Sequence, residues 1–326
     1  MTLNKKALPF QIALLAVLAV VCGLLLRNNF TALVLCLIGI YSIAVSGLDV
    51  LFGYTGQISF GHAGFYAIGA YTSAICTMRL GIPSLISLLL GSIVAMAFGF
   101  LIAVPASKLV KHFLSLLTIA FGQMVFMFAN STRPLTGGAS GLKDVPPISF
   151  FGVSLKGSVR MFPLIVALLV VMLILKSFLI RSRTGRAFIA IRENTVAAYG
   201  MGIHVRKYKI MAFAISAFLT GLAGALYAHL IGFISPETFM ATQSTLFMTM
   251  LLFGGLASLT GPVIGSAILL VIREAMQGFA AYQMLIYALF ILVVLFLLPT
   301  GTVGLLHKTK DLIVRLAGRG KADVNP

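Results

Sequence analysis

Long apolar segments recur along this chain of 326 residues, and several continue for about twenty residues with almost no charge. Segment 84–104 carries no charged residue, and segment 161–180 carries only Lys176. A helix needs about twenty apolar residues to cross the hydrocarbon core of a bilayer. Strands of a membrane barrel would alternate between apolar and polar residues instead. These segments therefore predict an all-α fold, a polytopic membrane helix bundle.

The composition supports this fold class, because 60% of the residues are hydrophobic and only 10% are charged. A soluble domain has roughly 45–50% apolar and about 25% charged residues, enough to cover its core with polar surface. We expect one transmembrane domain over residues 1–326, with an external loop at 131–160 and a cytoplasmic loop at 181–209. The apolar pattern predicts about ten spans: 8–26, 30–48, 58–78, 84–104, 113–130, 161–180, 210–231, 244–260, 262–280 and 282–299.

The net charge is +17, and the distribution of the basic residues indicates how the spans are oriented. With the amino terminus inside, 17 of the 24 Lys and Arg residues lie on the cytoplasmic side, 6 lie outside, and Arg273 falls within a span. This bias follows the positive-inside rule and places both termini in the cytoplasm. It indicates contact with anionic lipid rather than with nucleic acid. In this topology, we expect Lys176 on the cytoplasmic side and Asp49, at the end of a span, in solvent.

The two loops differ in character. Proline and glycine residues in 131–160 prevent a long helix there, and its apolar residues favour contact with the membrane surface or with a docked protein. In 181–209, we expect a helix over 186–199, with Thr184 as N-cap and Gly200 as the stop. The apolar face of this helix fits the lipid interface or a groove on a partner equally well. That face consists of Phe188, Ile191, Val196 and Tyr199.

Five glycines recur between residues 53 and 69, with polar residues between them. Each glycine inside a helix costs about 1 kcal/mol relative to alanine, so the segment suits close helix packing or an interrupted helix. The polar residues favour the lining of a solute pathway, in which exposed backbone groups face the solute. The candidate pathway residues are Thr55, Gln57, Ser59, Gly61 and His62.

A second glycine-rich run, 254–265, has the spacing of closely packed helices, and Pro262 predicts a turn before the next span. Farther along that span, Arg273 and Glu274 form the one charged pair that we expect in mid-span. Charges there are costly and usually functional. With Gln277, the two residues define a candidate polar network, either a structural bridge between helices or a relay for solute or protons.

The chain lacks the motifs of an enzyme. It contains no GxxxxGK[ST] phosphate loop, no nucleophile elbow and no HExxH zinc motif. Cys22, Cys36 and Cys76 fall within spans without the spacing of metal ligands, which favours small buried hydrophobes. We therefore expect no catalytic or metal site, and any energy must come from a partner subunit or from an ion gradient.

Several motifs together resemble the LivM-type permease subunit of bacterial branched-chain amino acid ABC importers. They occur in the family's order from about residue 40 to 270, and two positions depart from it: Ala257 stands where the family often has glycine, and Gly64 where it often has alanine. At both positions the residue stays small. The motifs occupy 53–63, 136–138, 181–187, 190–194, 209–213, 221–226, 254–255 and 261–262.

The resemblance implies a bacterial inner-membrane protein paired with a LivH-type permease. Two cytoplasmic ABC ATPase subunits would bind ATP and Mg, no cofactor would bind to this chain, and a periplasmic amino-acid-binding protein would dock outside. It also assigns the cytoplasmic helix to ATPase contact, through Phe188, Ile191, Arg192, Glu193, Tyr199 and Gly200. The alternatives are an ABC permease for urea or short amides, an ion-coupled secondary transporter with Glu274 as ion site, and a passive channel or scaffold.

Overall fold

The computed structural model describes residues 28–276, apart from 109–110 and 151–152. Within this part of the chain, helices form almost all of the regular structure. The expected spans 8–26 and 282–299 lie outside the described residues. Eight helices of 14 or more residues form the bundle: α2 (Asn29–Leu48), α3 (His62–Leu80), α4 (Ser84–Ala106), α5 (Lys111–Ser131), α7 (Ser158–Arg181), α10 (Val205–Ile231), α11 (Ala241–Gly254) and α12 (Gly261–Ala275).

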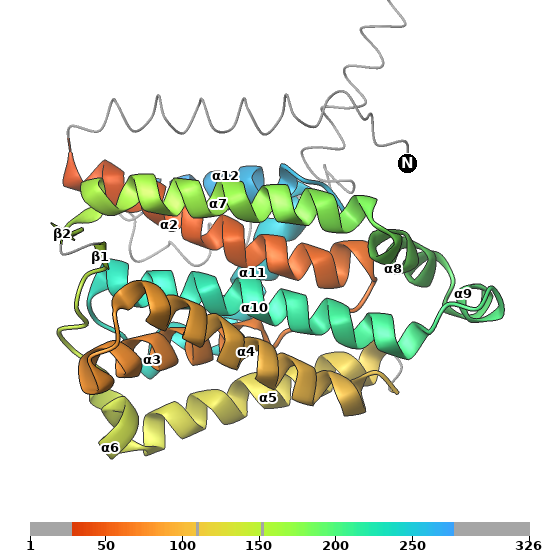
Figure 1. Cartoon of the computed structure of the whole chain (residues 1–326), viewed down its shortest axis with the longest axis horizontal. Coiled ribbons are helices and arrows are strands. Elements are labelled where there is room, and N and C mark those ends of the chain that lie inside the picture. Colours follow the sequence, from red (N-terminus) through yellow and green to blue (C-terminus); the bar gives the residue numbers. More distant parts are fainter. Residues whose placement is uncertain (1–27, 109–110, 151–152, 277–326) are drawn as a thin grey trace, which may run out of the picture.

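Helix α10 lies at the centre of the bundle and packs against α2, α3 and α4 (Figure 1). On one side of α10, helix α2 packs in turn against α7 and α12. On the other side, α3 contacts both α4 and α5. The buried core therefore follows α2, α3 and α10, whereas α4, α5 and α7 keep large apolar side chains exposed along one face each.

The connecting segments gather at two opposite ends of the bundle (Figure 1). One end carries α6 (Arg133–Thr136), the 3₁₀ turn η2 (Gly138–Ser140) and a small antiparallel hairpin of β1 (Ser149–Phe150) and β2 (Val153–Ser154). The other end carries α8 (Arg183–Glu193) and α9 (Thr195–Gly200). The loops 131–160 and 181–209 thus lie at opposite ends, as an external and a cytoplasmic loop must.

Five helices in the described part of the chain are long and apolar enough to cross a membrane: Asn29–Tyr54, Ser84–Ala106, Phe113–Ser131, Ser158–Arg181 and Val205–Ile231. These correspond to five of the ten expected spans. Three other expected spans coincide with α3, α11 and α12, which do not meet this criterion. Helix α11 has 14 residues and is about 21 Å long, shorter than a hydrocarbon core of about 30 Å. The count of ten spans and the side of the termini stay predictions.

Glycines bring the backbones of neighbouring helices together. A Cβ atom at Gly224 of α10 would overlap the backbone carbonyl of Tyr66 in α3, and one at Gly265 of α12 would overlap the carbonyl of Met250 in α11. The glycine-rich run 254–265 was expected to permit such an approach, and this approach joins two helices of the same chain. A turn does precede α12, at residues 255–260, but Pro262 itself lies in the first turn of the helix, which begins at Gly261.

Candidate functional site

The helical course of the chain is interrupted between α2 and α3. Helix α2 continues as one π-helical segment, η1 (Asp49–Tyr54), and the chain then turns at Gly56, which has a φ of +70°. A residue with a side chain is strained at this φ, so glycine suits the turn. Residues 56–61 run without helical structure until α3 begins at His62. The interrupted helix that the glycine-rich sequence allowed is therefore present.

Side chains alternate along this interruption. Thr55, Gln57 and Ser59 are buried, whereas Ile58 and Phe60 are half-buried. The buried polar groups bond to one another and to the backbone: Gln57 Nε2 donates to Thr55 Oγ1 at 3.1 Å, and Thr55 Oγ1 donates to the carbonyl of Leu51. All five predicted pathway residues are therefore buried, and the apolar residues between them face partly outward.

His62 fixes the start of α3 at the centre of the bundle. Its ring is fully buried and forms hydrogen bonds with Ser59 Oγ at 3.2 Å and with Ser216 Oγ of α10 at 2.7 Å. The next amide, Ala63 N, donates to Ser244 Oγ of α11 at 2.8 Å. Gly61 lies against α5, where a Cβ atom would come within 2.7 Å of the Thr118 carbonyl oxygen. The interruption is therefore held by contacts with three helices.

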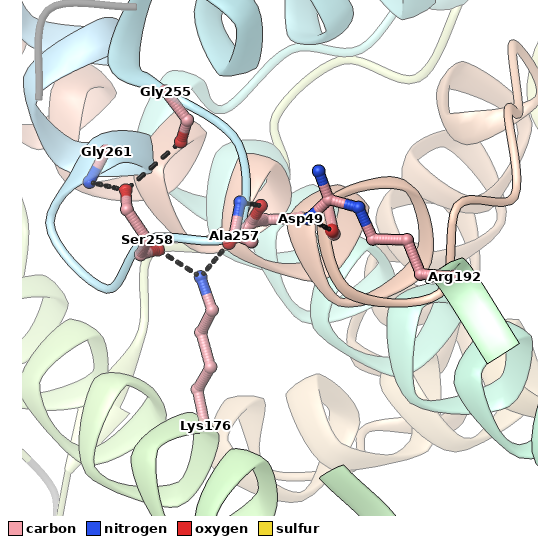
Figure 2. Close-up of polar contacts among 8 residues, drawn as sticks. Asp49, Lys176, Arg192, Gly255, Ala257, Ser258 and Gly261 are labelled. Carbon is pink, nitrogen blue, oxygen red and sulfur yellow. Dashed lines mark hydrogen bonds and ion pairs between the residues drawn. The ribbon is translucent and has the colours of Figure 1, made fainter. Parts of the chain in front are cut away.

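A buried ion pair lies beside the interruption, at the end of the bundle that carries α8. Lys176 Nζ of α7 donates to Asp49 Oδ2 at 2.7 Å, and both side chains are completely buried. The other carboxylate oxygen, Oδ1, accepts a hydrogen bond from the amide of Ala257 at 2.7 Å. Lys176 Nζ also donates to the carbonyl of Ser258 at 3.1 Å. The pair therefore joins η1, α7 and the turn between α11 and α12 (Figure 2).

Arg192 of α8 reaches the same cluster from the side opposite to Lys176 (Figure 2) and donates to the carbonyl of Gly53. Gly53 has room only for hydrogen at its Cα, because a Cβ atom would overlap the Asp49 carboxylate and crowd the amide of Ala257. Ala257 itself adopts a φ of +53°, which presents its amide to Asp49. We call Asp49, Lys176, Arg192 and the 255–260 turn the charged cluster.

Two predictions about charge were wrong. Asp49 is fully buried rather than solvated, and Lys176 points into the bundle rather than into the cytoplasm. The prediction that Arg273 and Glu274 are the one charged pair in mid-span is also wrong, because Asp49 and Lys176 form a buried ion pair. A signal existed in the sequence, since Lys176 lies more than one helical turn inside the apolar segment 161–180 and must meet a counter-charge there.

The helix expected over 186–199 is in fact two helices. Ser182, not Thr184, caps α8, its Oγ accepting from the amides of Thr184 and Gly185. Asn194 is extended, with φ −153°, and its Oδ1 caps α9 by accepting from the amides at 196 and 197. Asparagine favours caps over helix interiors because its side chain competes for backbone amides.

The break at Asn194 places the residues predicted to contact an ATPase in two different surroundings. Phe188 and Ile191 are buried against the bundle, whereas Glu193, Tyr199 and Gly200 are exposed. Tyr199 is 74% exposed. The predicted single apolar face was therefore wrong: α8 is anchored, and α9 projects.

The third predicted set is only partly described. Arg273 is exposed and Glu274 half-buried near the end of α12, and both take part in interactions. Gln277 lies outside the described residues, so the network of these three residues stays a prediction.

The ion pair yields a stability prediction. Lys176→Met leaves the Asp49 carboxylate buried without its partner, and we expect the free energy of unfolding to fall by about 3–5 kcal/mol. The double variant Asp49→Asn/Lys176→Met should regain most of this loss, because the new side-chain amide is neutral and its oxygen still accepts from the Ala257 amide. Denaturant unfolding of the purified chain in detergent measures both.

Lys143→Met, at an exposed lysine at the opposite end of the bundle, is the matched control and should change stability by no more than about 0.5 kcal/mol. Equal stability of Lys176→Met and this control would contradict the role given to the ion pair.

Comparison with known proteins identifies the family. Residues 30–298 match the family described as branched-chain amino acid transport system / permease component. The chain is 32% identical to the high-affinity branched-chain amino acid permease LivM of Escherichia coli K12 over 337 residues, covering 96% of this chain and 78% of LivM. LivM of Salmonella typhimurium is also 32% identical, over 87% of this chain and 72% of that protein.

LivH of Salmonella typhimurium, another permease protein of a branched-chain amino acid transport system, is 28% identical over 81% of this chain and 91% of LivH. No solved structure matches the chain. The resemblance noted in the sequence motifs is thus confirmed over nearly the whole chain. The chain belongs to the family of permease components of branched-chain amino acid transport systems.

Proposed function

We propose that this chain is a permease subunit of an ABC importer that moves branched-chain amino acids into the cytoplasm across a bacterial inner membrane. The observation that carries the proposal is the similarity to LivM along 96% of the chain. Five helices long and apolar enough to cross a membrane support it. The sequence has no nucleotide-binding loop, so the proposal places ATP hydrolysis, with its Mg, on partner subunits.

The proposed assembly contains a LivH-type permease, two cytoplasmic ABC ATPases and a periplasmic amino-acid-binding protein. Similarity to LivH as well as to LivM supports the first of these, because the chain is related to both of the permeases that would form the facing halves of one pore. The opposite ends of the bundle give room for the others: α8 and α9 at the ATPase end, and the hairpin end for the binding protein.

In our proposal, the interruption at 55–61 lines the solute path. An amino acid carries two charges, whose removal from water is too costly for unaided passage through hydrocarbon. Ile58 and Phe60 offer half-buried apolar surface to a branched side chain, and Gly56 forms the turn between α2 and α3 without a side chain. The buried residues Thr55, Gln57 and His62 hold this segment in shape through their hydrogen bonds, and Ser59 and Gly61 do the same.

The path proposal is tested by Ile58→Asn in the reconstituted assembly. Loss of an apolar contact of this size is worth about 1.5–3 kcal/mol, so we expect ATP-dependent leucine uptake to fall about tenfold or more. Uptake of radiolabelled leucine into proteoliposomes measures this. Ile58→Leu keeps the apolar volume and should transport normally.

Unchanged uptake by Ile58→Asn would contradict the path. Competition in the same assay tests the substrate: excess isoleucine or valine should reduce leucine uptake, and urea or acetamide should not. Uptake of urea in place of leucine, or uptake that needs an ion gradient and no ATP, would contradict the proposed function.

The ATPase contact is proposed for α9 and the end of α8. Phe188 and Ile191 fix α8 in the bundle, and Arg192 connects it to the charged cluster. Helix α9 projects beyond this anchor with Tyr199 and Met201 largely exposed. When the ATPases close on ATP, they would move α9 and α8 together, and the cluster would carry this movement to the interruption. Such a movement is driven only if ATP and the ATPases bind more tightly to one state of the permease than to the other.

Gly200→Trp tests this contact. A Cβ atom at Gly200 meets no other atom within 4 Å, so the chain itself has room for the side chain. Packing in the core of a protein interface is as dense as in a protein interior, and a buried indole would prevent docking. We expect recovery of ATPase subunits with the purified permease to fall by at least about tenfold.

The control is Ser154→Trp, an exposed position at the opposite end of the bundle, which should leave ATPase recovery unchanged. Full recovery of the ATPases with Gly200→Trp would exclude α9 as their docking site.

A further inference from the structure

A pocket of about 1080 Å³ opens between α9 and the ends of α4 and α10. Its α9 wall lies at the end of the bundle that also carries α8 (Figure 1), and no residue of the charged cluster lines it. None of the residues discussed as the solute path lines it. A ligand in this pocket would therefore be distinct from an amino acid in the proposed solute path.

The lining of this pocket has two chemically distinct parts. The inner wall is apolar and is formed by Phe100 of α4 together with Met211 and Ala214 of α10. The rim is basic, with Arg206 and Lys207 exposed and His204 and Lys209 beside them. Among the described residues that line the pocket, none is acidic. A ligand that uses both parts must be apolar at one end and anionic at the other.

The depth of the two parts matches a bilayer leaflet. Phe100 lies six residues before the end of α4, and Ala214 lies nine residues after the start of α10. At 1.5 Å per residue, Ala214 lies about 12 Å along α10 from Arg206, and Phe100 lies about 9 Å before the end of α4. Both helices are long and apolar enough to cross a membrane. The rim therefore falls at headgroup level and the wall beside acyl chains.

Arg206 is also positioned to hold a phosphate. Its Nε donates to Ser107 Oγ, just beyond α4, at 3.3 Å, and both residues line the pocket. Arginine binds phosphate oxygens with several donors at once. Basic pockets between membrane helices on the cytoplasmic side are typical sites for anionic lipid headgroups.

We propose that this pocket binds an anionic phospholipid of the cytoplasmic leaflet. The phosphate lies at Arg206 and Lys207, and an acyl chain lies along Phe100 and Ala214. Thr195, Val196 and Tyr199 of α9 form the outer edge of the pocket. Only Ala198 of this six-residue helix is buried in the protein, so the lipid supports α9 where the protein contributes little. That support bears on ATPase contact only if the proposed function holds, whereas binding itself does not depend on it.

Native mass spectrometry of the full chain tests the binding. The chain is extracted from vesicles of equal parts phosphatidylglycerol and phosphatidylcholine, and retained lipid is quantified. We expect preferential retention of phosphatidylglycerol, and a loss of about thirtyfold in that retention in Arg206→Gln/Lys207→Gln, which removes two charges from the rim.

The matched control is Arg181→Gln/Arg183→Gln, which removes the same charge from exposed positions at the same end but outside the pocket. It should retain phosphatidylglycerol as the unmodified chain does. Equal retention of the two lipids by the unmodified chain, or equal phosphatidylglycerol retention by the two double variants, would overturn the proposal.

A second measurement separates the lipid from a protein occupant. When ATPase subunits are added to the lipid-bound permease, we expect phosphatidylglycerol to stay bound. Its release in proportion to ATPase binding would assign the pocket to the ATPase and overturn the lipid proposal. The retention measurement uses neither ATPase nor transport, so its outcome does not depend on the proposed function, and the two proposals fail separately.

Discussion

The buried pair of Asp49 and Lys176 is the interaction on which the rest of this structure depends. Two charges without access to water are costly, and they persist only because each carboxylate oxygen and the ammonium group have partners at 2.7–3.1 Å. Those partners come from η1, α7 and the turn before α12, and the residues in contact are 82 or more positions apart in sequence. The charges thus specify one arrangement of three elements that apolar packing alone would leave free to slide.

The charged cluster lies between α8 and the segment that we propose as the solute path. Arg192 connects it to α8, and Gly53 lies only a few residues before the interruption at 55–61. A chain of polar contacts therefore leads from the projecting helix α9, through α8 and the charged cluster, to the segment that we propose as the solute path. In a bundle held mainly by apolar packing, these directional contacts are suited to transmit a displacement without loss of register.

The sequence predicted the local elements well and the long-range contacts poorly. The apolar segments 84–104 and 161–180 match Ser84–Ala106 and Ser158–Arg181 closely, because length and hydropathy determine a membrane helix. The glycines and polar residues of 53–64 allowed an interrupted helix, which the structure contains. Pairing of Asp49 with Lys176 could not be read from spacing, since it depends on how distant helices pack. The division of 186–199 at Asn194 turns on whether one side chain caps a helix or continues it, and the periodicity of its apolar residues does not distinguish the two.

Hydrogen exchange in Asp49→Asn tests most directly whether the charged cluster holds α8 and the 255–260 turn as one unit. Loss of the charge at residue 49 removes the counter-charge of Lys176 and weakens the side of the cluster that Arg192 contacts. The account predicts faster amide exchange in both 183–193 and 255–260, with exchange in 84–106 unchanged as evidence that the bundle stays folded. Faster exchange in the turn while α8 keeps its full protection would contradict the account.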